Sequence, residues 1–368
     1  MKMATPSYQH DMLSKCYKIC LKKMKQIDLN NLNLYLAEGS IRREKISDEL
    51  YFSNRYKHCT SNSKLKLINP EQSGSPKEYF EGGFGPKTAS LAMGTCVHVA
   101  TLEPEEFKLA PAIGRPTAKL GDVLDTVIKY RRKGYSIYNA ITQACKECDY
   151  YANCIDSKIK FIFEKGIKYY LKASKIDKDT IILPDVDREK CLASIKSLKN
   201  NRLVQSILHP TDAFGDALPA FNEEAFFADY VVVINDKAVI IPFKLKIDNW
   251  TIDVDNKTLV LNDLKTTGKV VNWFMNEEWG SFAKYHYDRQ FLCYADILKK
   301  YCESEFGFDE SWDFKANVCV VETFGEHNSK CFKVPEKRME AARPEFEKLM
   351  KMIGYYTIYG YDEEVEFI

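Results

Sequence analysis

The chain has 368 residues and a mass of 42.5 kDa, which suffices for one large domain or two small ones with a buried core. Apolar residues make up 45% and aromatic residues 13%, and this composition excludes a disordered chain. The 53 Lys+Arg and 52 Asp+Glu leave a net charge of +1, which excludes a wholesale basic coat for nucleic acid but not a local basic groove. No run of eighteen apolar residues occurs, so we expect no membrane partner.

The twelve cysteines mostly stand alone in apolar or amphipathic stretches, as Cys96, Cys293 and Cys319 do. The start of the chain, Met1–Pro6, lacks the apolar core of a secretion signal. We therefore expect reduced thiols and a cytoplasmic location, or the host cytoplasm for a phage-encoded protein.

The balanced net charge hides an asymmetry along the chain. Residues 1–60 hold 11 Lys+Arg against 6 Asp+Glu, and residues 155–205 hold 12 against 7. Residues 301–368 reverse the balance, with 8 against 15. Basic surface early and in the middle of the chain is compatible with docking of a polyanion, although solvated helix faces would show the same excess.

The first half of the chain is predicted to be mainly helical. Residues 7–36 mix polar and apolar positions at helical period without Gly or Pro, so we expect residues 1–60 to form a helical N-terminal extension. A turn-rich stretch follows, and then an apolar helix over residues 90–102 that ends before Pro104. Residues 120–206 again favour helix and predict a large helical insertion over about residues 112–206.

The second half begins with β-branched and aromatic runs. Three strands separated by short polar turns are predicted over residues 225–234, 238–254 and 258–265. A helix over 281–302, a strand over 314–322 and a helix over 336–353 follow. The fold class is therefore α/β, with a core of order α-β-β-β-α-β and a mixed sheet in a domain spanning 61–335, followed by a C-terminal helix and acidic tail over 336–368.

The third strand carries the triplet Asp263-Leu264-Lys265. Alternate side chains share a face of a strand, so Asp263 and Lys265 point the same way, and Asp248 on the adjoining strand can approach them. Two carboxylates on one face repel unless a cation lies between them, and hard oxygen ligands favour Mg²⁺ or Mn²⁺. A neighbouring lysine can orient or deprotonate a water and stabilise phosphate charge, which suits phosphodiester hydrolysis. By itself, however, a D-x-K triplet is more often a surface strand with alternating charges.

Further motifs accompany this triplet in a fixed order. They are Gly94-Thr95-Cys96-Val97-His98, Asn222-Glu223-Glu224-Ala225-Phe226-Phe227, Lys244-Leu245-Lys246-Ile247-Asp248 and Tyr287-Asp288-Arg289-Gln290-Phe291-Leu292-Cys293-Tyr294. With them the chain resembles the PD-(D/E)xK nuclease superfamily, specifically the RecB-like branch and phage recombination exonucleases similar to exonuclease VIII, over about residues 60–300. It departs from the pattern in having no proline before Asp248, a lysine at position 246 where the family has arginine, and a long spacing between Asp248 and Asp263.

The resemblance implies a restriction-endonuclease-like fold and a role for each matched residue. His98, Asp248, Asp263 and the carbonyl of Leu264 would bind Mg²⁺ or Mn²⁺, and Lys265 would be the catalytic lysine. Glu224 is an additional catalytic candidate, metal-linked or placing a second ion, with a solvated carboxylate at the strand edge as the alternative.

The predicted DNA contacts surround the same site. Gln290 and Tyr294 share a helical face and would contact phosphate or bases, with packing near the sheet as the alternative. Four basic residues lie around this site in sequence and would line the phosphate track: Lys244, Lys246, Lys269 and Arg289.

The activity implied is metal-dependent exonuclease action on linear DNA, duplex or single-stranded, in phage recombination or DNA processing. A single-strand annealing protein and a toroidal homo-oligomer are candidate partners. Two alternatives remain open: a catalytically inert nuclease-fold protein for DNA binding or particle assembly, and a structure-selective endonuclease. Cys145, Cys148 and Cys154 have part of the spacing of an iron–sulfur site, but helix packing is the default for them.

Overall fold

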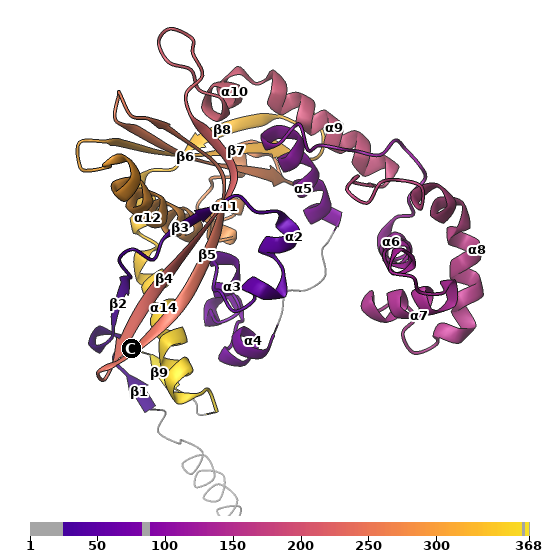
Figure 1. The fold of residues 1–368 in the computed structure, drawn as a ribbon, viewed down its shortest axis with the longest axis horizontal. Coiled ribbons are helices and arrows are strands. Elements are labelled where there is room, and N and C mark those ends of the chain that lie inside the picture. The colour runs from indigo at the N-terminus through magenta and orange to yellow at the C-terminus, as the bar shows by residue number, and fades with distance from the viewer. Residues whose placement is uncertain (1–24, 83–88, 363–364, 368) are drawn as a thin grey trace, which may run out of the picture.

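The computed structural model describes residues 25–82, 89–362 and 365–367, and its centre is one mixed β-sheet (Figure 1). The path of the sheet runs β2-β4-β5-β6-β7-β8, and β3 also pairs with β4. Its strands are β2 (Asn33–Leu36), β3 (Arg42–Glu44), β4 (Ala220–Ile234), β5 (Lys237–Asp253), β6 (Thr258–Thr267), β7 (Asp313–Glu322) and β8 (Ser329–Lys333). Only the pairing of β6 with β7 is parallel, and the other strand pairs of this sheet are antiparallel.

The meander β4-β5-β6 confirms the three strands that the sequence predicts. Its first turn is formed by Asn235 and Asp236, which both have positive φ and join the paired residues Ile234 and Lys237. Such a two-residue turn matches the right-handed twist of the strands, and Asn and Asp tolerate its left-handed backbone best after glycine. Strand β8 was not predicted, because it is short and only partly buried.

Helices cover both faces of the sheet, and each face has its own core. One core contains Trp250, Phe243 and Phe346, where α12 (Tyr287–Phe306) and α14 (Arg343–Tyr359) pack on the strands. The other contains Leu264 and Cys319, under α5 (Ala89–Leu102) and α9 (Asp185–Asn200). Burying large apolar side chains on both faces stabilises the sheet by roughly 1.5–3 kcal/mol for each of them. Smaller helices complete the fold: α2 (Asp48–Tyr51), α3 (Asn62–Leu65), α4 (Pro76–Glu81), α11 (Ser281–Lys284), α13 (Glu336–Glu340) and the 3₁₀ turns η1 (Leu29–Asn31), η2 (Asn54–Tyr56), η3 (Pro70–Gln72) and η4 (Val271–Trp273).

The helices predicted over residues 120–206 are present, in two groups. The first group is α6 (Ala118–Arg132), α7 (Ile137–Glu147) and α8 (Ile155–Ala173), which bury a core of their own and stand apart at one side of the molecule (Figure 1). The second group is α9 and α10 (Arg202–Leu208), whose buried residues join the core on the sheet. The insertion is therefore partly a separate lobe and partly a layer that packs on the central sheet.

The N-terminal helix predicted over residues 7–36 is wrong where the structure describes that segment. Residues 7–24 lie outside the described residues, and β1 (Lys25–Ile27), η1 and β2 occupy the rest. The alternation Asn33-Leu34-Tyr35-Leu36 has the period of a strand, and exposed and partly buried side chains alternate along it. Since β2 and β3 both pair with β4, residues 33–44 belong to the central sheet rather than to a helical extension.

The C-terminal part is also more closely integrated than a closing helix with an acidic tail. The predicted helix is divided into α13 and α14, and Pro344 lies in the first turn of α14. Strand β9 (Val365–Phe367) pairs in parallel with β1. None of the described helices is long and apolar enough to span a bilayer.

Candidate active site

Strands β5 and β6 pair over only part of their length, and they diverge at the two predicted aspartates. Their ladder joins 249–253 to 258–262 and then ends. Beyond it, the 237–247 part of β5 pairs with β4 on one edge and, on the other, forms an isolated bridge from Phe243 to Thr60. Residues 263–267 of β6 pair with β7. We call this divergence the strand fork; Asp248 and Asp263 are the first residue on each branch. The divergence leaves room for polar side chains between two strands of an otherwise continuous sheet.

One half of the site belongs to β6 and α12. The Lys265 ammonium lies 2.5 Å from Asp263 Oδ2 and 4.0 Å from Asp248 Oδ2. Gln290 Nε2 donates to Asp263 Oδ1 at 2.7 Å, and Asp263 is only 1% exposed. Burial lowers the pKa of Lys265, but the carboxylates of Asp263 and Asp248 outweigh it and raise that pKa above its usual value. Lys265 is therefore a fixed cation in this site.

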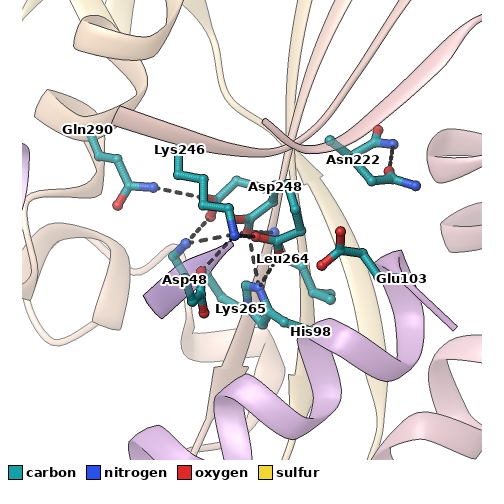
Figure 2. A network of polar contacts seen from close by, with 12 residues as sticks. Asp48, His98, Glu103, Asn222, Lys246, Asp248, Leu264, Lys265 and Gln290 are labelled. Carbon is teal, nitrogen blue, oxygen red and sulfur yellow. Dashed lines mark hydrogen bonds and ion pairs between the residues drawn. The ribbon is translucent and has the colours of Figure 1, made fainter. Parts of the chain in front are cut away.

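The other half joins residues from three elements (Figure 2). His98 on α5 places Nδ1 3.6 Å from a carboxylate oxygen of Glu223 on β4 and 3.6 Å from Asp248 Oδ2 on β5. The backbone N–H of Leu264 donates to the same Asp248 oxygen at 2.7 Å. Lys246 reaches Glu223 at 2.8 Å and Asp48 at 2.7 Å, so an ammonium also neutralises this half.

The pKa values in this second half are strongly shifted. Burial raises the pKa of Asp248 to about 7; the charges of Asp263 and Glu223 add to the effect, and those of His98 and Lys265 oppose it. Burial also opposes ionisation of Glu223, but its hydrogen bond to His98 and the charge of Lys246 lower its pKa to about 2. For His98 burial lowers the pKa, yet the Asp248 and Glu223 carboxylates raise it overall. In this half the ionisation of each of the three groups therefore depends strongly on the charges of its neighbours.

The structure places Glu223, and not the predicted Glu224, beside His98. Glu223 has a φ of +54°, and the β4–β5 ladder pairs residues 222 and 224 with β5 but omits 223. Glu224 points to the other side, where it forms an ion pair with Arg43 that stacks over Phe221. Positive φ is costly for a glutamate, and such strain is concentrated at functional sites. Sequence alternation cannot reveal this local distortion, so it could not distinguish the two glutamates.

Four asparagines on adjacent strands lie directly beside the site. Asn249 Nδ2 donates to Asn222 Oδ1 at 2.7 Å, Asn262 donates to Asn249 at 2.7 Å, and Asn317 donates to Asn262 at 2.9 Å. These residues are register partners on β4, β5, β6 and β7, and Asn249 and Asn262 are fully buried. We call this chain of amides the asparagine ladder. Glu223, Asp248 and Asp263 are sequence neighbours of its members, so the ladder lies directly beside these three carboxylates.

The residues present fit a divalent metal. Single donor atoms of His98, Glu223 and Asp248 lie within 4.8 Å of one another, and among the described residues this is the only such group of His, Cys, Asp or Glu. Asp263 Oδ2 is buried and accepts no hydrogen bond; its contact is the ion pair with Lys265. Imidazole with carboxylates is a donor set for Mn²⁺ or Mg²⁺. The predicted carbonyl ligand from Leu264 stays a prediction.

The predicted DNA-contact residues divide into two groups. Gln290 and Tyr294 lie at the site: Gln290 holds Asp263, and burial together with the Asp263 and Asp248 charges raises the pKa of Tyr294 well above its usual value. Lys246 also lies there, paired with carboxylates.

Two of the predicted phosphate contacts are structural instead. Arg289 is 1% exposed and binds Glu345 and Asn62, because its position on α12 faces the interior of the protein. Lys244 is buried and donates to the carbonyl of Tyr51, with its ammonium over that ring. Neither side chain is available for a phosphate in this arrangement. The cysteines at 145, 148 and 154 are respectively buried, partly buried and exposed, and form no metal group in the described chain.

Comparison with known proteins agrees with this geometry. Residues 216–355 match a family model described as a PDDEXK-like domain of unknown function. No curated protein matches the chain. A crystal structure described as "Putative exonuclease" from Eubacterium rectale is 10% identical, covers 88% of this chain and 90% of its own, and superposes with a TM-score of 0.42, too low to carry an argument. The matched segment, residues 216–355, contains strands β4 to β7 with the strand fork and the D-x-K triplet, and it is similar to a PDDEXK-like domain.

Proposed function

We propose that the protein is a metal-dependent deoxyribonuclease that hydrolyses phosphodiester bonds at the ends of linear DNA. The observation that carries this proposal is the strand fork. It brings Asp248, Asp263 and Lys265 within ion-pair distance and sets His98 and Glu223 beside them. A site built only to stabilise the fold would not need a carboxylate whose pKa is raised to about 7 or a glutamate at positive φ.

His98, Glu223 and Asp248 would hold the metal, with Asp263 beside them. When bound, Mg²⁺ or Mn²⁺ supplies Lewis-acid stabilisation of phosphate charge. Lys265 keeps its proton because two carboxylates face it, so its ammonium orients the attacking water by donating to it and offsets the charge that develops on the phosphate. Gln290 keeps Asp263 from rotating.

The preference for DNA ends and a role in phage recombination rest on the ordered motifs shared with RecB-like and exonuclease VIII-like enzymes. The basic excess of residues 155–205 supports a nucleic-acid substrate. A cytoplasmic setting, an annealing-protein partner and a ring-shaped oligomer belong to the same proposal and are tested separately from the chemistry.

The test is degradation of end-labelled linear DNA with Mg²⁺, on a gel, by the wild type and by Asp263→Ala and Lys265→Ala. Each substitution should lower the rate at least about 100-fold, since each removes a preorganised charge. Tyr35→Ala is the control: this exposed residue on β2 pairs with Val231, roughly 26 Å along β4 from Glu223. Undiminished activity in both site variants would exclude the assignment.

The choice of substrate separates the alternatives. Covalently closed circular DNA should resist the enzyme, because an exonuclease needs an end; cleavage of circles would establish an endonuclease. A wild type that neither degrades DNA nor binds Mn²⁺ in calorimetry would be the inert nuclease-fold protein.

A further inference from the structure

Three large aromatic side chains are exposed in the segment that links β6 to α12. Trp273 is 59% exposed, Trp279 64% and Tyr285 54%. The other two tryptophans of the chain, Trp250 and Trp312, are buried at 0% and 9% exposure. Exposing two indoles and a phenol within thirteen residues leaves much apolar surface in water, which marks a binding surface more often than a solvated one. We call Trp273, Trp279 and Tyr285 the aromatic platform.

Buried side chains and local hydrogen bonds hold the segment that carries the platform in place. Phe274 and Phe282 are buried at 1% and 0%, and the Phe282 N–H donates to the Phe274 carbonyl at 3.0 Å. Asn276 Oδ1 accepts from the Trp279 N–H at 2.8 Å. A Cβ at Gly280 would lie 2.3 Å from the Asn276 carbonyl oxygen, so only glycine permits this close turn. The exposed rings are therefore held on an ordered scaffold, which lowers the entropy cost of binding.

One member of the platform, Tyr285, lies close to the strand fork. The ring of Tyr285 lies 5.9 Å from that of Tyr287, centroid to centroid, and the Lys265 ammonium lies 5.1 Å from the centre of the Tyr287 ring. The Tyr287 ring thus lies between Tyr285 and the lysine of the proposed active site. The two elements that bound this segment, β6 and α12, are also those that supply Asp263 and Gln290.

Charge in the segment suits bases better than a duplex backbone. The Lys284 ammonium lies 5.6 Å from the Tyr285 ring, and Lys269 donates to the Trp279 carbonyl at 3.0 Å. Glu277 and Glu278 lie between the two tryptophans in sequence and are both exposed. A continuous track for phosphates would not contain two free carboxylates, whereas stacking on base faces is insensitive to them.

We propose that the aromatic platform binds the unpaired bases of single-stranded DNA and leads that strand into the strand fork. The inference rests on the proposed function for the identity of the polymer. Bases in a duplex already stack on one another and offer no free face, whereas each base of a single strand can stack on Trp or Tyr. Lys284 neutralises a phosphate beside a stacked base, and the strand then passes Tyr287 to reach Lys265.

The test is a titration of the full-length protein with oligothymidine, in EDTA, followed by tryptophan fluorescence. Stacking on Trp273 and Trp279 should quench the emission, and Ala at either of these residues or at Tyr285 should weaken binding about 5-fold or more. Tyr35→Ala should bind as the wild type does. Unfolding curves check that the exposed-site variants keep their fold.

Three outcomes of the binding experiments would overturn the proposal, and a fourth outcome concerns self-association. The first three are absence of quenching, equal binding by the Trp273→Ala/Trp279→Ala double variant, and equal loss of blunt-duplex binding in that variant. Concentration-dependent self-association that the double variant abolishes, without an effect on oligonucleotide binding, would assign the platform to a contact between copies and would also overturn it.

Failure of the platform is distinguishable from failure of the nuclease assignment. The titration contains no metal and is repeated in the Lys265→Ala background, where hydrolysis is blocked but stacking should persist. Quenching without any hydrolysis by the wild type would refute the proposed nuclease function and support single-strand binding by the platform. Hydrolysis without quenching would support the nuclease function and refute single-strand binding by the platform.

Discussion

The two halves of the site differ in how they are built. Asp263 and Lys265 come from one strand and are joined by an ion pair, and Gln290 holds the Asp263 carboxylate, which is only 1% exposed. His98, Glu223 and Asp248 come from three separate elements, and their side chains remain 23%, 12% and 13% exposed.

This difference indicates a division of labour. In the β6 half each charge already has a partner, which suits a group that stabilises a transition state without rearranging. In the three-element half, carboxylates and an imidazole with shifted pKa values face one another, which suits a site completed by an added cation. If every substitution in the site changes the metal affinity and the rate of hydrolysis together, the two halves do not have separate roles.

The largest effect is expected from Lys265→Met compared with Asp248→Asn. Lys265→Met should lower hydrolysis by about 100-fold or more while leaving the Mn²⁺ affinity within a few-fold, because no ligand is removed. Asp248→Asn should lose both. Calorimetry with Mn²⁺, together with single-turnover rates, measures the two properties independently. A parallel loss of Mn²⁺ binding in Lys265→Met would show that the halves are not separate.

The neighbouring glutamates offer a sharper comparison. Glu223→Gln should weaken Mn²⁺ binding about 10- to 100-fold, the usual cost of altering a group that holds or orients a metal. Glu224→Gln should keep that affinity but reduce the free energy of unfolding, because the half-buried Arg43 loses its charged partner. Calorimetry and urea unfolding of both variants decide the matter. Equal Mn²⁺ affinities in the two variants would remove Glu223 from the metal site.

The same contrast shows what the sequence could predict. Asp263 and Lys265 were identifiable because strand periodicity alone puts them on one face, and the meander around them follows from β-branched runs and polar turns. The ordered motifs also located His98 and Asp248. Their position next to Asp263 depends on the residue at which β5 and β6 diverge. No local sequence pattern indicates where that divergence begins.

Two other features depend on contacts between residues far apart in the sequence, and for one of them a four-residue alternation is the local signal. The burial of Arg289 depends on Glu345, which is 56 residues distant and packs against α12 only in the folded chain. The strand character of residues 33–36 depends on pairing with β4 some two hundred residues later, and tertiary pairing overrides the helical tendency of the segment.

A smaller change in metal affinity is expected when the pH is changed. Asp248 keeps its proton until the pH approaches about 7, and the raised pKa of His98 acts in the same direction. Metal binding needs the unprotonated forms, so affinity should rise with pH through this window, by about tenfold between pH 6 and pH 8. Glu223, with a pKa of about 2, contributes nothing there. Calorimetry in buffers of different ionisation enthalpy should show proton release at pH 6.5; affinity that is flat or falls with pH contradicts the prediction.

The smallest effect on metal affinity is expected from the asparagine ladder, and it tests whether the ladder positions the two halves relative to each other. Asn262→Ala removes the hydrogen-bond partners of two buried side-chain groups, the NH₂ of Asn317 and the Oδ1 of Asn249. The free energy of unfolding should therefore fall by at least about 2 kcal/mol. Asp263 is the next residue after Asn262 in the sequence. A small displacement of Asp263 at the strand fork should weaken Mn²⁺ binding about 3-fold. Asn317→Ala breaks one bond at the end of the ladder, beside no site residue, so it should lower stability and leave the Mn²⁺ affinity unchanged. Urea unfolding and calorimetry of the two variants measure both quantities. If both variants bind Mn²⁺ as the wild type does, the ladder serves the fold alone, and the position of Asp248 relative to Asp263 is set by the divergence of the strands.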